Sequence, residues 1–228
     1  MITLYDLAGA DDRRFSPNTW RSRLALEHKG LEYAARGFGF GDIPTLCGGK
    51  YKTVPIITDG KTEVCGSEAI VDYLEETYDT APSLFGDWGQ RSIRFFENWC
   101  AAQVMAPLAP MIMLDIYKHL KPEDQAYFRE SREKRFGKSL EDLAEGREDG
   151  LPALTKALHP ARMMVRDGGY LGGGKPNYAD YVLIGQFQWA RCCSEFQVLG
   201  EDDKLWPWMQ RMLDVYGGVL RDEPSYWG

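Results

Sequence analysis

The sequence predicts an α/β domain followed by an all-helical domain. Three observations indicate this: strand and helix patterns alternate through residues 1–80, proline and glycine gather in the linker-like stretch 81–89, and only helical patterns follow in 90–228. Strands alternating with helices are typical of a sheet with helices packed on it, whereas helix after helix is typical of a bundle. At 228 residues, the chain is long enough for two modest domains, each with its own core.

The first part reads as strand, helix, strand, a loop, then two strands and a helix. Apolar and β-branched runs predict strands at 2–7, 31–38, 53–60 and 61–66, and helical spacing predicts helices at 17–29 and 67–78. Asp59-Gly60, between the last two strands, is a dipeptide typical of a tight hairpin turn. This order fits a small sheet of mixed strand direction with helices packed against it.

The second part carries helical spacing throughout. It predicts helices at 90–120, 122–146, 151–167 and 177–194. The longest apolar region, residues 99–114, is shorter than the ~20 residues that span a bilayer. It is also interrupted by Gln103, Pro107 and Pro110, so a buried, kinked helix is the better interpretation.

Composition excludes several classes of function. A formal net charge of −7 and a pI near 5.1 argue against nucleic acid or an anionic membrane as the main partner. The N-terminus lacks the basic segment and long apolar core of a secretory signal. The five cysteines form no C-x-x-C pair, which favours reduced thiols in a cytoplasmic protein. The three histidines are too scattered to predict a metal site.

The stretch FSPNTWR places Ser16 before Pro17 at the start of the first predicted helix. A serine hydroxyl caps a free backbone N–H there, and proline fits the first helical position because its missing N–H has no partner to lose. The same hydroxyl lies at the positive end of a helix dipole, where it can also stabilise an anion such as a thiolate. Taken alone, this stretch predicts a cap.

Two further patterns fall at junctions between loops and regular elements. Pro55 at the entry to a strand indicates a sheet edge or a cis peptide bond. Ser67 is predicted to cap the helix that follows, with Glu68 adding negative charge to its first turn. Together with Ser16, these positions suit a small peptide-like anion that pairs with the backbone of Val54 and leaves its carboxylate at the Ser67 helix.

In this order and spacing, the patterns resemble the soluble glutathione S-transferase family over essentially the whole chain. The stretch GGGKPNYADYVLIGQF is similar to the family's capping box and hydrophobic staple, with Asn177 as cap and Asp180 three residues on. The resemblance implies a thioredoxin-like, glutathione-binding domain over 1–80 and a helical domain with a hydrophobic acceptor site over 90–228. SPNTWRSRLALEHKG and GGKYKTVPII look most like the bacterial β-etherase-type branch and its fungal relatives, which open aryl ethers with glutathione.

The family resemblance also implies roles for individual residues. Ser16 matches the position that donates a hydrogen bond to the glutathione sulfur, and Asn18 could share or replace that donation. The backbone of Val54 matches the residue that pairs with the cysteinyl part, and Ser67 matches the serine that holds the γ-glutamyl carboxylate. The residues expected to bind glutathione are Lys52, Thr53, Val54, Pro55 (as a cis-proline), Ser67 and Glu68.

One departure from the family pattern lies immediately before Ser67. Most members carry Glu or Asp there, whereas this chain has Gly66. The γ-glutamyl ammonium therefore lacks its usual acidic partner, which affects the expected glutathione affinity.

Met105, Met111 and Tyr117, on the apolar helix, are candidates for the acceptor pocket. Flexible thioethers suit a pocket that accepts varied aromatic molecules, although core packing explains the same residues equally well.

The leading hypothesis is a cytoplasmic, homodimeric glutathione transferase that acts on an electrophilic aromatic or aryl-ether substrate. Its first-helix pattern also resembles the maleylacetoacetate isomerases, which leaves a glutathione-dependent isomerase as one alternative. A protein that binds glutathione or a hydrophobic ligand without turnover is another. A thiol–disulfide oxidoreductase is disfavoured, because no cysteine begins the first helix.

Overall fold

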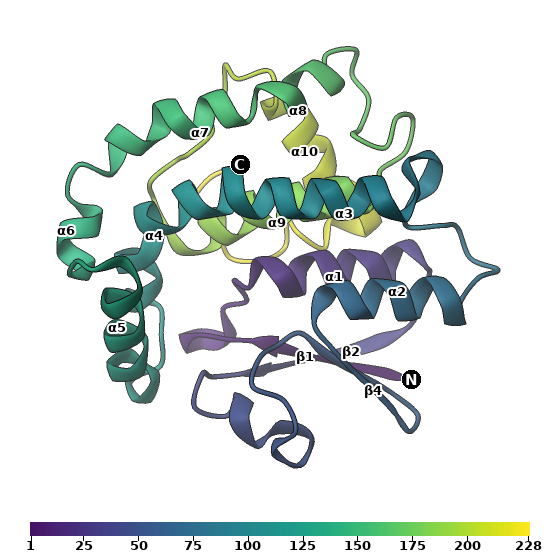
Figure 1. Cartoon of the computed structure of the whole chain (residues 1–228), viewed down its shortest axis with the longest axis horizontal. Coiled ribbons are helices and arrows are strands. Elements are labelled where there is room, and N and C mark those ends of the chain that lie inside the picture. Colours follow the sequence, from purple (N-terminus) through teal and green to yellow (C-terminus); the bar gives the residue numbers. More distant parts are fainter.

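A computed structural model describes all residues from 1 to 228. Figure 1 shows a small sheet domain beneath a larger helical domain, which confirms the predicted fold class. The strands are β1 (Ile2–Leu7), β2 (Tyr33–Phe38), β3 (Ile56–Asp59) and β4 (Thr62–Cys65). They lie in the order β2-β1-β3-β4, with β2 parallel to β1 and the other two neighbouring pairs antiparallel. The mixed sheet thus follows from the predicted strand–helix–strand and hairpin units.

The two helices of the sheet domain, α1 (Pro17–His28) and α2 (Ser67–Thr77), lie between the sheet and the helical domain (Figure 1). Leu4 of β1 and Ile57 of β3, which face each other in the sheet, are completely buried. Leu24 of α1 and Leu74 of α2 are equally buried and belong to the same core. The alternating apolar residues of the strands therefore hold both helices against the sheet.

The helical domain consists of helices of unequal length around α9. They are α3 (Gly89–Cys100), α4 (Ala106–Lys118), α5 (Pro122–Phe136), α6 (Leu140–Ala144), α7 (Leu151–Ala157), α8 (His159–Met164), α9 (Tyr178–Cys193) and α10 (Trp206–Asp214). A π-helical turn, Ala101–Met105, joins α3 to α4. Pro107 and Pro110 lack the backbone N–H that a regular helix ladder needs, and the helix widens in the turn before them.

The boundaries of two predicted helices in this domain were wrong. The helix predicted over 122–146 ends at Gly137, whose φ of +69° places it in the left-handed region that favours glycine. The helix predicted over 151–167 divides before Pro160. Helix α10 was not predicted at all, although Pro207 near its start and its buried Trp208 and Met212, four residues apart, are typical helix signals.

Helix α9 joins the two domains. All but one of its residues are buried, and it packs closely along α1. At Gly185, an added Cβ atom would lie 2.7 Å from the carbonyl oxygen of Pro17, so glycine allows the start of α1 to approach α9 directly. The predicted capping box of Asn177 and Asp180 is confirmed at its N-terminus. The close approach of Pro17 to Gly185 fixes the beginning of α1 against the helical domain.

One continuous helical stretch, residues 86–118, has the length and hydropathy of a membrane-spanning segment. In its most apolar window, 44% of the residues are buried within the protein. Leu108, Ile112 and Ile116 of this stretch belong to the hydrophobic core. Length and composition alone are weak evidence for membrane insertion, and the burial is what a core helix requires.

Candidate functional site

Ser16 is the N-cap of α1. Its Oγ accepts a hydrogen bond from the backbone N–H of Thr19 at 3.2 Å, and the side chain is largely buried, at 6% exposure. Accepting this bond uses only a lone pair of the hydroxyl, so its hydrogen stays available to a second partner. Ser16 can therefore cap the helix and donate to an anion at the same time.

The loop before β3 carries the second predicted element of the site. The Val54–Pro55 peptide bond is cis, and the N–H and C=O of Val54 make no hydrogen bond within the chain. The carbonyl of Pro55 accepts from the N–H of Gly66 at 2.9 Å, which ties this loop to the start of α2. Lys52 and Thr53 are exposed beside it. The loop thus presents unpaired backbone groups next to α2.

The predicted capping role of Ser67 was wrong. The N-cap of α2 is Gly66, whose φ of +94° suits glycine, and Ser67 is the first residue of the helix. No side chain caps this end, so the backbone N–H groups of the first turn are left without a side-chain partner. The Ser67 Oγ instead accepts a hydrogen bond from Nε of Arg21 at 2.9 Å. A serine hydroxyl and an arginine therefore flank a free helix N-terminus.

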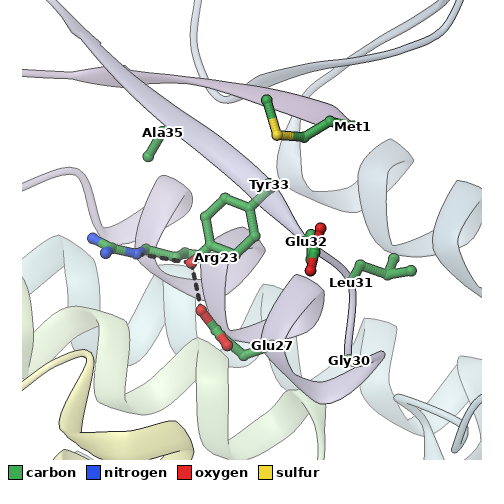
Figure 2. A pocket seen from close by; sticks show the side chains of 8 residues that line it. All are labelled: Met1, Arg23, Glu27, Gly30, Leu31, Glu32, Tyr33 and Ala35. Carbon is green, nitrogen blue, oxygen red and sulfur yellow. Dashed lines mark hydrogen bonds between the residues drawn. The ribbon is translucent and has the colours of Figure 1, made fainter.

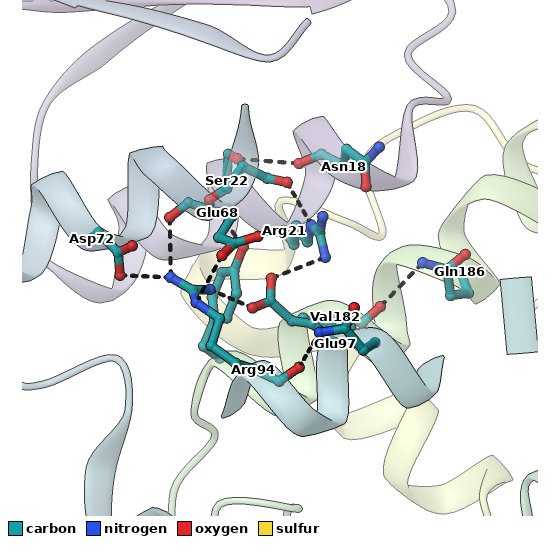
Figure 3. A network of polar contacts seen from close by, with 12 residues as sticks. Asn18, Arg21, Ser22, Glu68, Asp72, Arg94, Glu97, Val182 and Gln186 are labelled. Atoms are coloured by element: carbon teal, nitrogen blue, oxygen red, sulfur yellow. Dashed lines mark hydrogen bonds and ion pairs between the residues drawn. The ribbon is translucent and has the colours of Figure 1, made fainter. Parts of the chain in front are cut away.

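Arg21 belongs to a charged network that links the domains, and Figure 3 shows it. Its Nη1 lies 3.3 Å from Oε1 of Glu97 on α3, and the other oxygen of Glu97 accepts from Arg94. Arg94 also pairs with Asp72 at 2.6 Å and with Glu68 at 3.2 Å. Burial raises the pKa of Glu97, against the opposing effect of both arginines. The network holds a buried carboxylate and a guanidinium side by side near Ser67.

Three residues of this network, Arg21, Glu68 and Glu97, line a pocket of about 230 Å³ between the domains, which we call the interdomain pocket. It is lined by Asn18, Arg21, Glu68, Glu97, Asn98, Cys100, Ala101, Met105, Val182 and Gln186. The structure thus brings together three residues predicted from the sequence, Asn18, Glu68 and Met105. The π-helical turn contributes Ala101 and Met105 to the wall, as such turns often do at functional sites.

Met111 and Tyr117, the other acceptor-pocket candidates, do not line the interdomain pocket. Met111 is buried, and its side chain packs against Gly150 in the helical domain. The ring of Tyr117 lies 4.6 Å from the guanidinium carbon of Arg129. Both side chains contact other residues of the helical domain.

A larger and more open pocket, of about 700 Å³, lies beside β2 and contains none of the predicted site residues (Figure 2). Within it, the hydroxyl of Tyr33 accepts from Arg23 at 3.0 Å and donates to Glu27 at 2.7 Å. These three polar side chains are thus hydrogen-bonded to one another. The interdomain pocket is therefore the better candidate site.

Arg21, Arg94 and Glu97 were missed as site residues. Arg21 follows Asn18 by three residues, which places both on one helix face, and this spacing could have identified it. Glu97 and Arg94 have no local signal, because only the packing of α3 on α1 and α2 brings Glu97 to Arg21 and Arg94 to Glu68.

All five cysteines are free thiols. No group of three His, Cys, Asp or Glu side chains is placed to hold a metal ion.

The sheet with its cis-proline loop, joined through α1 and α9 to a helical domain, defines the glutathione transferase fold. A family model described as the N-terminal domain of glutathione S-transferase matches residues 12–82, and one described as the C-terminal domain matches 93–216. Because the second alone covers more than half of the chain, the protein belongs to the glutathione S-transferase family.

Two solved fungal structures resemble the chain over nearly its full length. Glutathione transferase GSTFuA3 from Phanerochaete chrysosporium is 29% identical, with a TM-score of 0.76 over 100% of this chain and 97% of that chain. CsGST63524 from Ceriporiopsis subvermispora, solved in complex with glutathione, is 26% identical, with a TM-score of 0.75 over 97% and 94% of the two chains. The glutathione S-transferase-like protein ustS from Aspergillus flavus is 26% identical over 78% of this chain and 75% of its own length.

Proposed function

We propose that the protein binds glutathione beside the interdomain pocket and uses Ser16 to stabilise its thiolate for attack on an electrophilic carbon. The observation that carries the proposal is the Ser16 hydroxyl, which caps α1 with a lone pair and keeps its hydrogen to donate. A free thiol with a pKa near 8.5 is only about 3% ionised at pH 7, whereas lowering that pKa by about 2 units makes the thiolate the main form. Asn18, on the pocket wall, is the second candidate donor.

Three groups of the sheet domain suit the peptide part of glutathione. The unpaired N–H and C=O of Val54 can pair with the cysteinyl backbone, as an added strand would. The γ-glutamyl carboxylate fits the free N-terminus of α2, where the Ser67 hydroxyl and Arg21 both lie. Lys52 and Thr53 are exposed on the same loop, where the glycyl end of the tripeptide would lie.

The γ-glutamyl ammonium needs an acidic partner that Gly66 does not supply. Glu97 and Glu68 both line the interdomain pocket, and Glu97 lies within 3.3 Å of the arginine that contacts Ser67. We assign the ammonium chiefly to Glu97, because this residue is only 8% exposed and a charge pair is stronger out of water. A carboxylate already paired with arginines can still accept another donor, since its two oxygens offer about four lone-pair sites.

In the proposed reaction, the thiolate sulfur forms a bond to the electrophilic carbon, and the leaving group departs with the bonding electron pair. The protein contributes by favouring the thiolate and by holding the two substrates together. For the acceptor we propose an aromatic or aryl-ether compound, with Met105 and Ala101 as apolar wall residues. This substrate class rests on the resemblance to β-etherase-type transferases, and its support here is the apolar side of the pocket.

We also propose a homodimer in the cytoplasm. Phe95 on α3 is 74% exposed, which is unusual for a large aromatic side chain and suits a contact with a second copy. The five free thiols suit a reducing compartment. Sedimentation of the wild type and of Phe95→Glu tests the dimer, and a monomer in both samples would contradict it.

The proposed function is tested by calorimetry with glutathione, followed by turnover of a chromogenic aryl halide, a β-aryl ether and maleylacetoacetate. We expect micromolar to millimolar binding and glutathione-dependent turnover of the aryl halide or the ether. Binding without turnover of any substrate would instead identify a binding protein, and turnover of maleylacetoacetate alone would identify an isomerase. Absence of binding would contradict the proposal altogether.

A further inference from the structure

The C-terminal segment, residues 221–228, returns to the loop that precedes Ser16. Oε1 of Glu223 accepts a hydrogen bond from the backbone N–H of Arg14 at 2.7 Å. Nη1 of Arg13 donates to the carbonyl of Pro224 at 3.1 Å, and its guanidinium lies 5.6 Å from the ring of Tyr226. Two consecutive residues of the β1–α1 loop are therefore held by the far end of the chain.

The C-terminal segment is itself fixed to the helical domain. Nε of Arg191 on α9 donates to the carbonyl of Trp227 at 2.6 Å, and Nη2 of the same side chain donates to Oγ of Ser225 at 2.9 Å. The indole of Trp227 donates to the carbonyl of Ser194 at 3.0 Å. Because α9 is a core helix, the segment offers Glu223 a rigid base from which to hold the loop.

Both backbone polar groups of Arg14 are hydrogen-bonded to side chains. Its N–H is bound by Glu223, and its carbonyl accepts from the indole Nε1 of Trp20 at 3.1 Å. Trp20 is 2% exposed and lies one turn into α1. Ser16 comes two residues after Arg14. The orientation of the Ser16 hydroxyl therefore depends on the hydrogen bonds that fix the Arg14 backbone.

We propose that Glu223 is a positioning residue for Ser16, acting through the backbone N–H of Arg14. This inference rests on the proposed function, since it assumes that Ser16 faces the glutathione sulfur. Hydrogen bonds to a carboxylate are about twice as strong as neutral ones, so this contact is well suited to fix a loop. A small displacement of a reacting group is enough to cost rate, up to about 100-fold for 1 Å.

Three variants separate this role from simple stabilisation. Glu223→Ala removes the acceptor, and Glu223→Gln keeps an oxygen that can accept the Arg14 N–H while removing the charge. Asp222→Ala is the matched control, because Asp222 is exposed, adjacent in sequence and without a side-chain hydrogen bond or ion pair, and the change removes the same charge.

We expect Glu223→Ala to lower kcat/KM for the aryl electrophile about tenfold and to raise the pKa of the bound glutathione thiol, with glutathione affinity little changed. Glu223→Gln should fall between Glu223→Ala and the wild type in kcat/KM, and Asp222→Ala should stay within about twofold of the wild type. Backbone amide exchange over residues 13–20, measured on the free protein, should accelerate only in Glu223→Ala. A merely structural role would lower the melting temperature without moving the thiol pKa.

Two results would overturn the inference: Glu223→Ala with wild-type thiol pKa, rate and exchange, or Glu223→Gln as impaired as Glu223→Ala. A wild-type protein that binds no glutathione is a distinct outcome, because it contradicts the proposed function itself. In that case Glu223 would have no catalytic group to position, even if amide exchange over residues 13–20 accelerated in Glu223→Ala as expected.

Discussion

Nε of Arg21 lies 2.9 Å from Oγ of Ser67, so the second turn of α1 and the first turn of α2 meet through a guanidinium and a hydroxyl. Both groups lie at the uncapped N-terminus of α2, where a carboxylate is stabilised by free N–H groups. Neither helix alone makes this arrangement. It requires the sheet to bring the two helices together.

Replacing Arg21 should weaken glutathione binding and destabilise the fold. Arg21→Lys keeps the charge but loses the fork that reaches Ser67 and Glu97 together, and we expect about a tenfold loss of affinity. Arg21→Ala also leaves buried Glu97 with Arg94 as its only arginine partner, so the free energy of unfolding of this variant should fall by about 1–3 kcal/mol. Calorimetry and urea denaturation measure the two effects. Wild-type affinity in Arg21→Ala would place the carboxylate elsewhere.

Glu97→Gln separates the ammonium contact from general support of the pocket. With glutathione, we expect a loss of affinity of about tenfold, in line with removal of one partner of a charge-assisted bond. The analogue glutaryl-cysteinyl-glycine lacks the amino group, so its affinity should be nearly the same for Glu97→Gln and the wild type. Equal losses for both ligands would show that Glu97 only holds Arg21. Glu68→Gln, tested in parallel, should show a smaller loss because Glu68 is largely exposed.

Asp180 should be among the most sensitive positions for stability. Its carboxylate accepts from the backbone N–H groups of Leu171, Gly172 and Asn177 and from the indole of Trp208, at 2.7–3.0 Å. Asp180→Ala leaves these buried donors without a partner, so the free energy of unfolding should fall by about 3–5 kcal/mol.

Urea denaturation measures this loss, with Asp87→Ala as the control, because Asp87 is exposed and makes no side-chain hydrogen bond or ion pair. A change of less than about 1 kcal/mol in Asp180→Ala would contradict the assignment of the network.

Asp6 predicts a pH dependence of stability. Burial raises the pKa of its carboxyl from 3.8 to about 6, although Arg14 opposes the shift. Between these values, the folded protein retains a proton that the unfolded chain has lost. This contribution to stability is therefore complete below pH 4 and lost as the pH rises through 6, and it amounts to about 3 kcal/mol. Asp6→Asn should remove that loss, so its unfolding free energy should fall less between pH 4 and 7. An identical pH profile for both proteins would contradict the raised pKa.

The fold was predictable because its signals are local. Alternating apolar runs marked the strands, Asp59-Gly60 marked the hairpin, and Asn177 with Asp180 marked the start of the core helix. Helix α10 and the breaks after α5 and α7 were missed, since Gly137 and Pro160 lie inside otherwise helical patterns. The role of Ser67 was misjudged by one position, because the positive φ of Gly66 moves the cap to that glycine.

The candidate site was only partly predictable. Ser16, Val54 and Ser67 carry sequence signals because each begins or precedes a regular element. Glu97 and Glu223 carry none, since their roles arise from contacts with residues 76 and 209 positions away in the sequence. Such contacts depend on how the helical domain packs on the sheet domain, and no local pattern encodes that.

The central claim is that Ser16 lowers the pKa of the glutathione thiol. The direct measurement is an ultraviolet titration of the thiolate of bound glutathione in the wild type, Ser16→Ala and Asn18→Ala. We predict that the thiol pKa lies about 2 units below its free value in the wild type and rises by about 1 unit or more in Ser16→Ala, with a smaller rise in Asn18→Ala. A thiol pKa in Ser16→Ala that equals the wild-type value would contradict the claim.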